Sequence, residues 1–245
     1  MGFYTKNSGL IGTGFVNSPI GVHDIVSNQQ AGGKLAPGTI VNGTTATYGI
    51  YNSVTFLGNG SIDFVTPGTI DIMVVGGGGS YGGGHGYGCG GGYVNITIDA
   101  EIASATTYNV VVGAGATSYT TGQFGLTSSF GSYTATGGAS SSVNIHTTVY
   151  PTQHGGDADG GRIPHTSLQT TDGVINTYRD GTNQYYGGGG AAPSEYSNHG
   201  LMTPSLTGGG GQRSAGGVNT GGGAGGYSHS TYYGGSGIVV IRYLA

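Results

Sequence analysis

The chain has 245 residues and a formal net charge of −4, with 57 glycines but only six Lys and Arg and ten Asp and Glu. Six basic residues spread over the whole chain form no patch that could follow a phosphate backbone, so we expect no nucleic-acid partner. No segment approaches the roughly 20 apolar residues of a bilayer span, which predicts no membrane insertion, and the single cysteine, Cys89, cannot form an internal disulfide.

Residues 1–45 differ from the rest because glycine is sparser there. The stretch GVHDIVSNQQAGG is compatible with one short helix or turn that ends at glycine. We interpret 1–45 as an attachment segment and 46–245 as a single glycine-rich domain. A long polar insertion over 139–186 interrupts that domain and lacks the repetitive glycine of its flanks.

From Val54 onward the pattern predicts short strands separated by turn residues. Strands are expected over 53–57, 61–66 and 69–75, because Gly58-Asn59-Gly60 and Pro67-Gly68 are typical of turns. In YVNITIDA, Val94, Ile96 and Ile98 are predicted to share one face of a further strand.

Two further strands complete the predicted fold. The stretch TTYNVVVGAG predicts one, and Ile238–Ile241 predict a central strand because they are apolar on both faces. Short strands with regular turn punctuation and no long helix predict an all-β fold, an antiparallel β-sandwich of jelly-roll type.

Glycine tracts over 76–92, 187–190, 208–211 and 216–226 lie between these strands. Sorted by threes, residues 76–93 give one column of glycines interrupted by His85 and another in which glycine alternates with tyrosine. Three residues per turn is the repeat of the extended left-handed helix, in which bare glycine columns allow close chain packing. The tracts therefore predict an inserted bundle of polyglycine-II helices; the alternative is an unstructured loop.

The order of these pieces resembles the glycine-rich domain of bacteriophage tail-fibre and other virion proteins over about residues 54–245. The motifs that carry the resemblance are TPGTIDIMVVGGGG, GGGYVNITIDAEI, TYNVVVGAGA, TSSFGSYTATGG and GGSGIVVIRY. Related architectures include the polyglycine-II adhesins of T-even-like phages. The start, GFYTKNSGLIGTG and GVHDIVSNQQ, is similar to structural proteins of marine cyanobacterial phages. The resemblance implies a homo-oligomer located in the virion that contacts other virion proteins.

Few residues are arranged for metal binding or catalysis. His154, Asp157 and Asp159 in HGGDADGGR offer oxygen and nitrogen atoms to calcium, but a calcium loop needs more carboxylates, so an exposed turn is the simpler interpretation. His85 and Cys89 do not supply the four convergent ligands of a zinc site. A thin set of carboxylates gives little basis for a glycosidase, so we expect no enzyme activity and no cofactor.

The eighteen tyrosines, set among Ser, Gly and Asn with no tryptophan, resemble the composition of recognition loops. We predict that Tyr178, Tyr185, Tyr186 and Tyr196, in loops 139–186 and 193–206, contact a host-surface receptor that is a protein or a polysaccharide. The expected function is that of a tail-fibre or tail-tip protein. The alternative is a purely structural virion subunit, such as a capsid decoration, neck or fibre-linking protein.

Overall fold

The computed structural model describes residues 35–82, 89–103, 106–117, 124–139, 173–190, 208–211, 214–225 and 231–245. The strands are β1 (Pro37–Tyr48), β2 (Tyr51–Phe64), β3 (Gly68–Val75), β4 (Tyr81–Gly82), β5 (Val94–Ile102), β6 (Thr107–Val111), β7 (Ser128–Phe130), β8 (Tyr133–Ala135), β9 (Val174–Asn176), β10 (Gln184–Tyr186), β11 (Thr231–Tyr232) and β12 (Ile238–Leu244). None of the described residues lies in a helix. The all-β prediction is therefore confirmed for this part of the chain.

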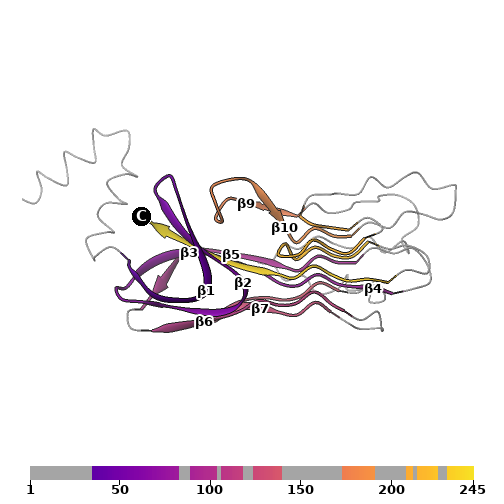
Figure 1. The fold of residues 1–245 in the computed structure, drawn as a ribbon, viewed down its shortest axis with the longest axis horizontal. Coiled ribbons are helices and arrows are strands. Elements are labelled where there is room, and N and C mark those ends of the chain that lie inside the picture. Colours follow the sequence, from indigo (N-terminus) through magenta and orange to yellow (C-terminus); the bar gives the residue numbers. More distant parts are fainter. Residues whose placement is uncertain are drawn as a thin grey trace, which may run out of the picture.

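One large antiparallel sheet has the order β5-β3-β12-β2-β6-β7-β8, and β1 pairs with β2 beside this path. The sheet curves until its two edges meet: Tyr93 donates its N–H to the Thr136 carbonyl at 3.0 Å, and the Asn95 amide donates to the Thr134 carbonyl at 2.9 Å. This nearly closed, barrel-like sheet forms the left half of the molecule in Figure 1. The prediction of a jelly-roll sandwich is not supported, because a single sheet coils on itself.

A bend in β2 explains how one sheet can coil in this way. The first part of β2 pairs with β12, from Tyr51 to Phe56, whereas Gly60–Asp63 pair with β6. Between these parts β2 has extra residues opposite β1, where the register shifts between Val41 and Gly43. Such a bulge bends a strand and increases its twist, so β2 passes from one wall of the barrel to the next.

The C-terminal strand β12 lies in the centre of the sheet, between β2 and β3. This confirms the prediction of a central strand, and Ile238, Val239, Val240 and Ile241 are all fully buried because both faces of the strand are covered.

The core has two parts, one on each face of this sheet. Inside the barrel, the largest fully buried side chains are Phe56, Phe64, Phe130, Ile62, Ile70, Ile72 and Ile241. On the outer face, a second cluster joins the sheet to the β9–β10 hairpin; it consists of Met73, Val75, Val94, Tyr178, Tyr186, Ile238 and Val240. The hairpin lies above the sheet in Figure 1, so the last part of the predicted insertion 139–186 belongs to the folded body.

A bulge in β5 changes the predicted alternation. Ile70 pairs with Ala100 and Ile72 with Thr97, so β5 has one residue more than β3 between these pairs. Asp99 has a positive φ of 54° there. Val94 therefore packs on the outer cluster, whereas Ile98, predicted to share its face, is 66 % exposed.

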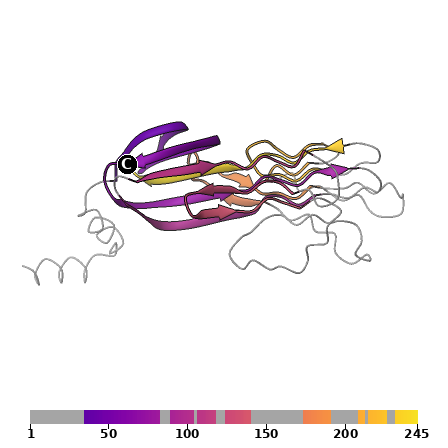
Figure 2. The same cartoon turned by 90° about the horizontal axis from the view of Figure 1, so that it is seen from below.

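Glycine-rich segments leave the barrel and run side by side toward the other end of the molecule, as Figures 1 and 2 show. Within segment 76–80, Gly76 and Gly79 both donate to residues of segment 89–93, the first to Tyr93 and the second to Gly90. Gly77 donates to Leu126 and Gly78 to Gly235, which lie on two other segments. The donors thus return to the same neighbour after three residues, whereas a β-strand alternates with a period of two.

Segment 76–80 is enclosed by six others, to which its N–H and carbonyl groups are hydrogen-bonded: 89–93, 124–127, 233–237, 136–139, 112–117 and 221–225. Segment 221–225 is enclosed in the same manner by 76–80, 89–93, 187–190, 208–211, 214–217 and 233–237. These ten segments are called the glycine array below. Two segments are central, and the other eight form a ring around them.

Glycine is required in the array because neighbouring backbones occupy the space of a side chain. A Cβ added to Gly76 would lie 2.1 Å from the Thr136 carbonyl oxygen, and one added to Gly78 would lie 2.0 Å from that of Gly222. Real Cβ atoms essentially never approach another atom so closely. Glycine is therefore needed here because it permits the backbones to approach closely. None of these segments is helical, so the predicted inserted helix bundle is not supported.

Candidate functional site

Two of the four tyrosines predicted to contact a ligand are buried. Tyr178 is 7 % exposed and Tyr186 is 2 % exposed, and both pack in the outer core cluster between the β9–β10 hairpin and the sheet. In this structure they hold the hairpin in place and present no surface to a partner. The sequence suggested exposure because Tyr185 and Tyr186 lie beside a glycine run, but an alternating hairpin strand places neighbouring residues on opposite faces.

Tyr185 points the other way. It is 40 % exposed and pairs across the hairpin with Ile175, which is 47 % exposed. Two exposed apolar side chains therefore stand next to each other on the outward face of the hairpin. An exposed tyrosine beside an aliphatic residue suits a surface that is partly apolar and partly hydrogen-bonding. Tyr196 lies outside the described residues.

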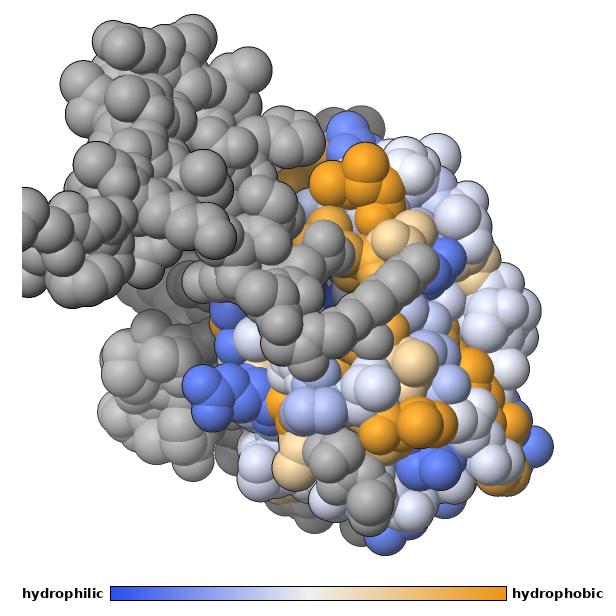
Figure 3. All heavy atoms as spheres, turned by 90° about the vertical axis from the view of Figure 1, so that its left-hand side faces the viewer, coloured by the Kyte–Doolittle hydropathy of each residue, from blue (hydrophilic) through white to orange (hydrophobic). Residues whose placement is uncertain are grey.

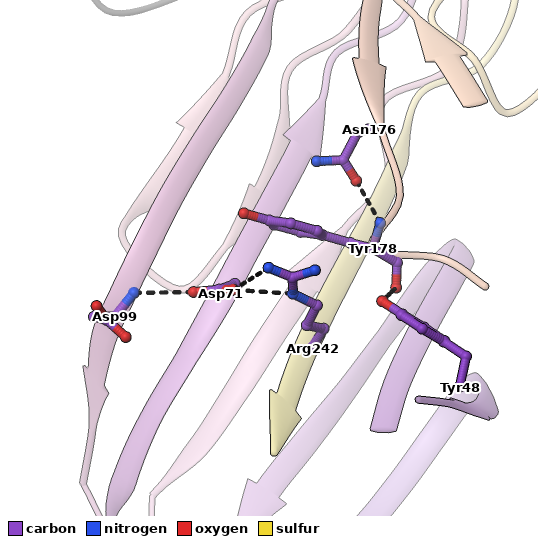
Figure 4. A network of polar contacts seen from close by, with 6 residues as sticks. All are labelled: Tyr48, Asp71, Asp99, Asn176, Tyr178 and Arg242. Carbon is purple, nitrogen blue, oxygen red and sulfur yellow. Dashed lines mark hydrogen bonds and ion pairs between the residues drawn. The ribbon is translucent and has the colours of Figure 1, made fainter. Parts of the chain in front are cut away.

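An arginine fixes the loop that joins β9 to β10 (Figure 4). The Arg242 guanidinium donates through Nε and Nη2 to one Asp71 carboxylate oxygen, at 3.0 and 2.8 Å. Its Cζ lies 4.2 Å from the ring centre of Tyr51 and 4.0 Å from that of Tyr178. The cation is thus held between two aromatic faces, a favourable arrangement that strengthens as water is excluded.

Hydrogen bonds to the loop backbone complete this attachment. The Tyr48 hydroxyl donates to the Tyr178 carbonyl at 2.6 Å, and the Ser53 hydroxyl donates to the Arg179 carbonyl at 2.7 Å. The Tyr178 N–H in turn donates to the Asn176 side chain at 2.7 Å, as Figure 4 shows. The loop is therefore tied to β1, β2 and β12, and the hairpin that carries Tyr185 has a fixed position on the barrel.

Burial changes the ionisation of the tyrosines in and near this attachment. Loss of solvent is the main cause that raises the pKa of Tyr48, Tyr178, Tyr186 and Tyr243 above the ordinary value for tyrosine. For Tyr178 the Asp71 carboxylate adds to the rise in pKa, while the Arg242 charge opposes it. All four hydroxyls therefore stay neutral at physiological pH.

The Arg242–Asp71 pair was missed in the sequence, although a signal was present. Both residues interrupt apolar strands, in the runs IDIMVV and IVVIRY, in a chain with few charges. Charged side chains in the interior of a sheet are almost always paired with an opposite charge. Once β3 and β12 are known to be neighbours, an ion pair between Asp71 and Arg242 can therefore be predicted. The order itself was not available from the sequence.

The described residues contain no group of three His, Cys, Asp or Glu that could hold a metal ion. His85 and the calcium candidates His154, Asp157 and Asp159 lie outside the described residues. Cys89 is fully buried in the array and packs with Ala224 and Tyr232. In the described ranges, no helix is long and apolar enough to cross a membrane.

The molecule has two different ends. Leu35, the first described residue, packs against Gly68 at the barrel end, where Ala245 donates to the Ile50 carbonyl at 2.8 Å. Figure 3 shows this end, on which apolar residues form separate small groups among hydrophilic ones. At the opposite end β4 and β11 pair, Tyr81 with Tyr232.

A family model described as a glycine-rich domain matches residues 55–244, the greater part of the chain. The match spans the barrel from β2 to β12 and the whole of the array. No curated protein is significantly similar to this sequence.

Proposed function

This chain belongs to the glycine-rich domain family, and from that premise we propose that it is a structural protein of a bacteriophage virion, a tail-fibre or tail-tip component that binds the host surface. The order of strand and glycine motifs, together with the similarity of the N-terminal stretch to cyanobacterial phage proteins, supports the phage assignment. The function that follows is binding, and it involves no enzyme activity, no cofactor and no nucleic acid.

The glycine array is the observation that carries this proposal. Donors that return to the same neighbour after three residues, and two segments with six neighbours each, are the features of polyglycine-II packing. We therefore interpret the array as a polyglycine-II bundle inserted into a β-barrel. Because glycine predominates in its interior, most of its cohesion comes from contacts between backbones, and these do not depend on the sequence of the connecting loops.

The two ends of the molecule suggest how such a protein is oriented. Residues 1–34 precede Leu35, which lies at the barrel end. We place attachment to the virion there, through residues 1–34 and other virion proteins. The array then extends away from the particle, so that its far end, with the β4–β11 pair, faces the host.

Tyr185 and Ile175 form the contact surface that we assign among the described residues. Both are exposed, and the hairpin that carries them is fixed by the Arg242 attachment described above. Tyr178 and Tyr186 are buried between this hairpin and the sheet, so we do not include them in the contact surface. Tyr196 stays a prediction from the sequence.

The proposal is tested by binding of the purified, fluorescently labelled chain to intact marine cyanobacteria, across a panel of strains. We expect saturable binding to at least one strain, and a loss of about tenfold in affinity for Tyr185→Ala, the size expected when an aromatic contact worth about 1.4 kcal/mol is removed. Tyr233→Ala, which removes a similarly exposed tyrosine from the array, is the matched control and should bind normally. Binding to no strain, or equal binding by both variants, would refute the receptor role.

A purely structural virion subunit is the second candidate. The described residues of the array carry no charged side chain, and uncharged surfaces suit permanent contacts that do not depend on ionic strength. A chain lacking residues 1–34 keeps β1 intact and separates the two roles. If the protein is an adhesin, the chain lacking residues 1–34 still binds cells. If it is a structural subunit, the full chain is found in particles, and neither the full nor the shortened chain binds cells.

A further inference from the structure

Apolar side chains gather on one side of the array that no described segment covers. Val111, Phe124 and Leu126 are 43 %, 42 % and 61 % exposed, and Ala114 between them is exposed as well. They lie on two neighbouring segments, joined where Leu126 donates its N–H to the Ala114 carbonyl at 2.8 Å. These four residues are called the lateral patch. The segments that carry it continue β6 and β7 along the lower border of the molecule in Figure 1.

The three-residue repeat of the array places these side chains on the outside. On segment 112–117, Gly113 and Ala116 are buried, whereas Ala114 and Thr117 are exposed. This segment bonds to neighbours at 76–80, 124–127 and 233–237. Central segment 76–80 is hydrogen-bonded to six neighbouring segments, whereas segment 112–117 is hydrogen-bonded to three. About half of the circumference of segment 112–117 is therefore open to a further partner.

We propose that the lateral patch is an interface between two copies of this chain, related by a two-fold axis. Charge is the first reason to choose a second copy. The charged residues that the structure describes all lie on the barrel or the β9–β10 hairpin: Asp63, Asp71, Asp99, Glu101, Arg179, Asp180 and Arg242. The chain has a net charge of −4, so two copies repel each other. This repulsion is weakest when they meet through the array, whose described residues carry no charge.

Shape is the second reason. An isologous interface requires a surface that is complementary to itself. Exposed Ala114 lies between Gly113 and Gly115, and exposed Phe124 and Leu126 stand on either side of buried Gly125. The gaps at these glycines can receive the side chains of an antiparallel copy. The contact joins exposed side chains and leaves the backbone bonds of the array unchanged.

The size of the face predicts a weak dimer. Residues 107–117 span about 35 Å at strand and polyproline-like rises, and the two segments at about 5 Å spacing are about 10 Å wide. The strip therefore offers about 350 Å² per copy, below the roughly 800 Å² per partner of a stable standard interface. The dimer should consequently dissociate on dilution.

Sedimentation velocity of the purified full chain, from 1 to 200 μM, tests this inference. We expect a concentration-dependent shift from monomer to dimer. Leu126→Lys places a charge in the patch and should raise the dissociation constant at least tenfold, while its thermal unfolding stays close to that of the parent because the side chain is exposed. Ile98→Lys, at a position on β5 that is equally exposed, should dimerise like the parent.

The outcomes separate cleanly. A parent chain that stays monomeric up to 200 μM overturns the interface, as does a dimer that Ile98→Lys disrupts and Leu126→Lys does not. A trimer or larger ring that Leu126→Lys dissociates would refute the two-fold geometry. The measurement needs no host receptor, so its result is independent of the cell-binding experiment.

Discussion

The replacement Gly78→Ala tests whether the array depends on bare backbone. Gly78 is in a central segment, where its N–H donates to the Gly235 carbonyl at 2.8 Å and its own carbonyl accepts from the Ala116 N–H at 2.9 Å. A Cβ at this position would lie 2.0 Å from the Gly222 oxygen and 2.5 Å from the Gly222 carbonyl carbon. The obstacle is backbone on a neighbouring segment, so no side-chain rotation can relieve it.

The expected cost follows from the displacement required. Carbon and oxygen in contact lie about 3.3 Å apart, so segments 76–80 and 221–225 must separate by more than 1 Å. Overpacking costs about 1–3 kcal/mol, and weakening of one or two buried hydrogen bonds adds about 1 kcal/mol each. We expect Gly78→Ala to lose about 2–5 kcal/mol, a large part of the 5–15 kcal/mol by which typical domains are stable.

Urea unfolding followed by tyrosine fluorescence and circular dichroism measures this loss. The matched control is Gly58→Ala, where an added Cβ meets no atom within 4 Å. Both changes reduce the entropy of the unfolded chain equally, so their difference reports the array alone. If the two variants unfold within 1 kcal/mol of each other, as they would if 76–80 were an ordinary loop, close glycine packing does not stabilise this protein.

Three further predictions concern single side chains and pH. Ser128→Ala should cost about 2–6 kcal/mol, since this buried hydroxyl donates to one backbone carbonyl at 2.6 Å and accepts from one backbone N–H at 2.8 Å, and each unsatisfied group costs about 1–3 kcal/mol; Ser129→Ala is the control, and equal stability of the two variants would contradict this role of the hydroxyl. Tyr186→Phe should leave stability unchanged or raise it by about 1 kcal/mol, because the buried hydroxyl has no hydrogen-bond partner among the residues that the structure describes; a clear loss in thermal unfolding would show a partner. The contribution of four tyrosines to stability should be constant near neutral pH and fall above about pH 10, because the raised pKa of Tyr48, Tyr178, Tyr186 and Tyr243 means that the unfolded chain ionises first; a urea midpoint that stays constant between pH 9 and 11.5 would contradict this.

Strands with a strong pattern could be predicted from the sequence. The run IVVI was placed in the centre of a sheet because it is apolar on both faces, and β12 is central. Turn residues correctly separated β2 from β3 at Pro67-Gly68. The boundary expected between residues 45 and 46 instead falls inside β1, whose sequence PGTIVNGTTATY has too few apolar residues to mark a strand by alternation.

Faces and partners could not be predicted, since they depend on neighbours distant in the chain. Ile98 is exposed because of a bulge opposite β3, and nothing in YVNITIDA marks it. Tyr186 is buried because its hairpin lies on a sheet whose order was unknown. The glycine tracts showed a three-residue repeat, but identical glycines cannot specify that Gly78 pairs with Gly235. That choice is set by the barrel strands, which deliver each tract to its place.

The central position of β12 has a consequence for biosynthesis. On the ribosome, β2 and β3 emerge early and stay separated by a vacant slot, which only residues 238–244 can fill. The nascent chain must therefore hold apolar edges open until residues 238–244 have been translated and have left the ribosome. Chains that stop before β12 should be caught by chaperones or degraded.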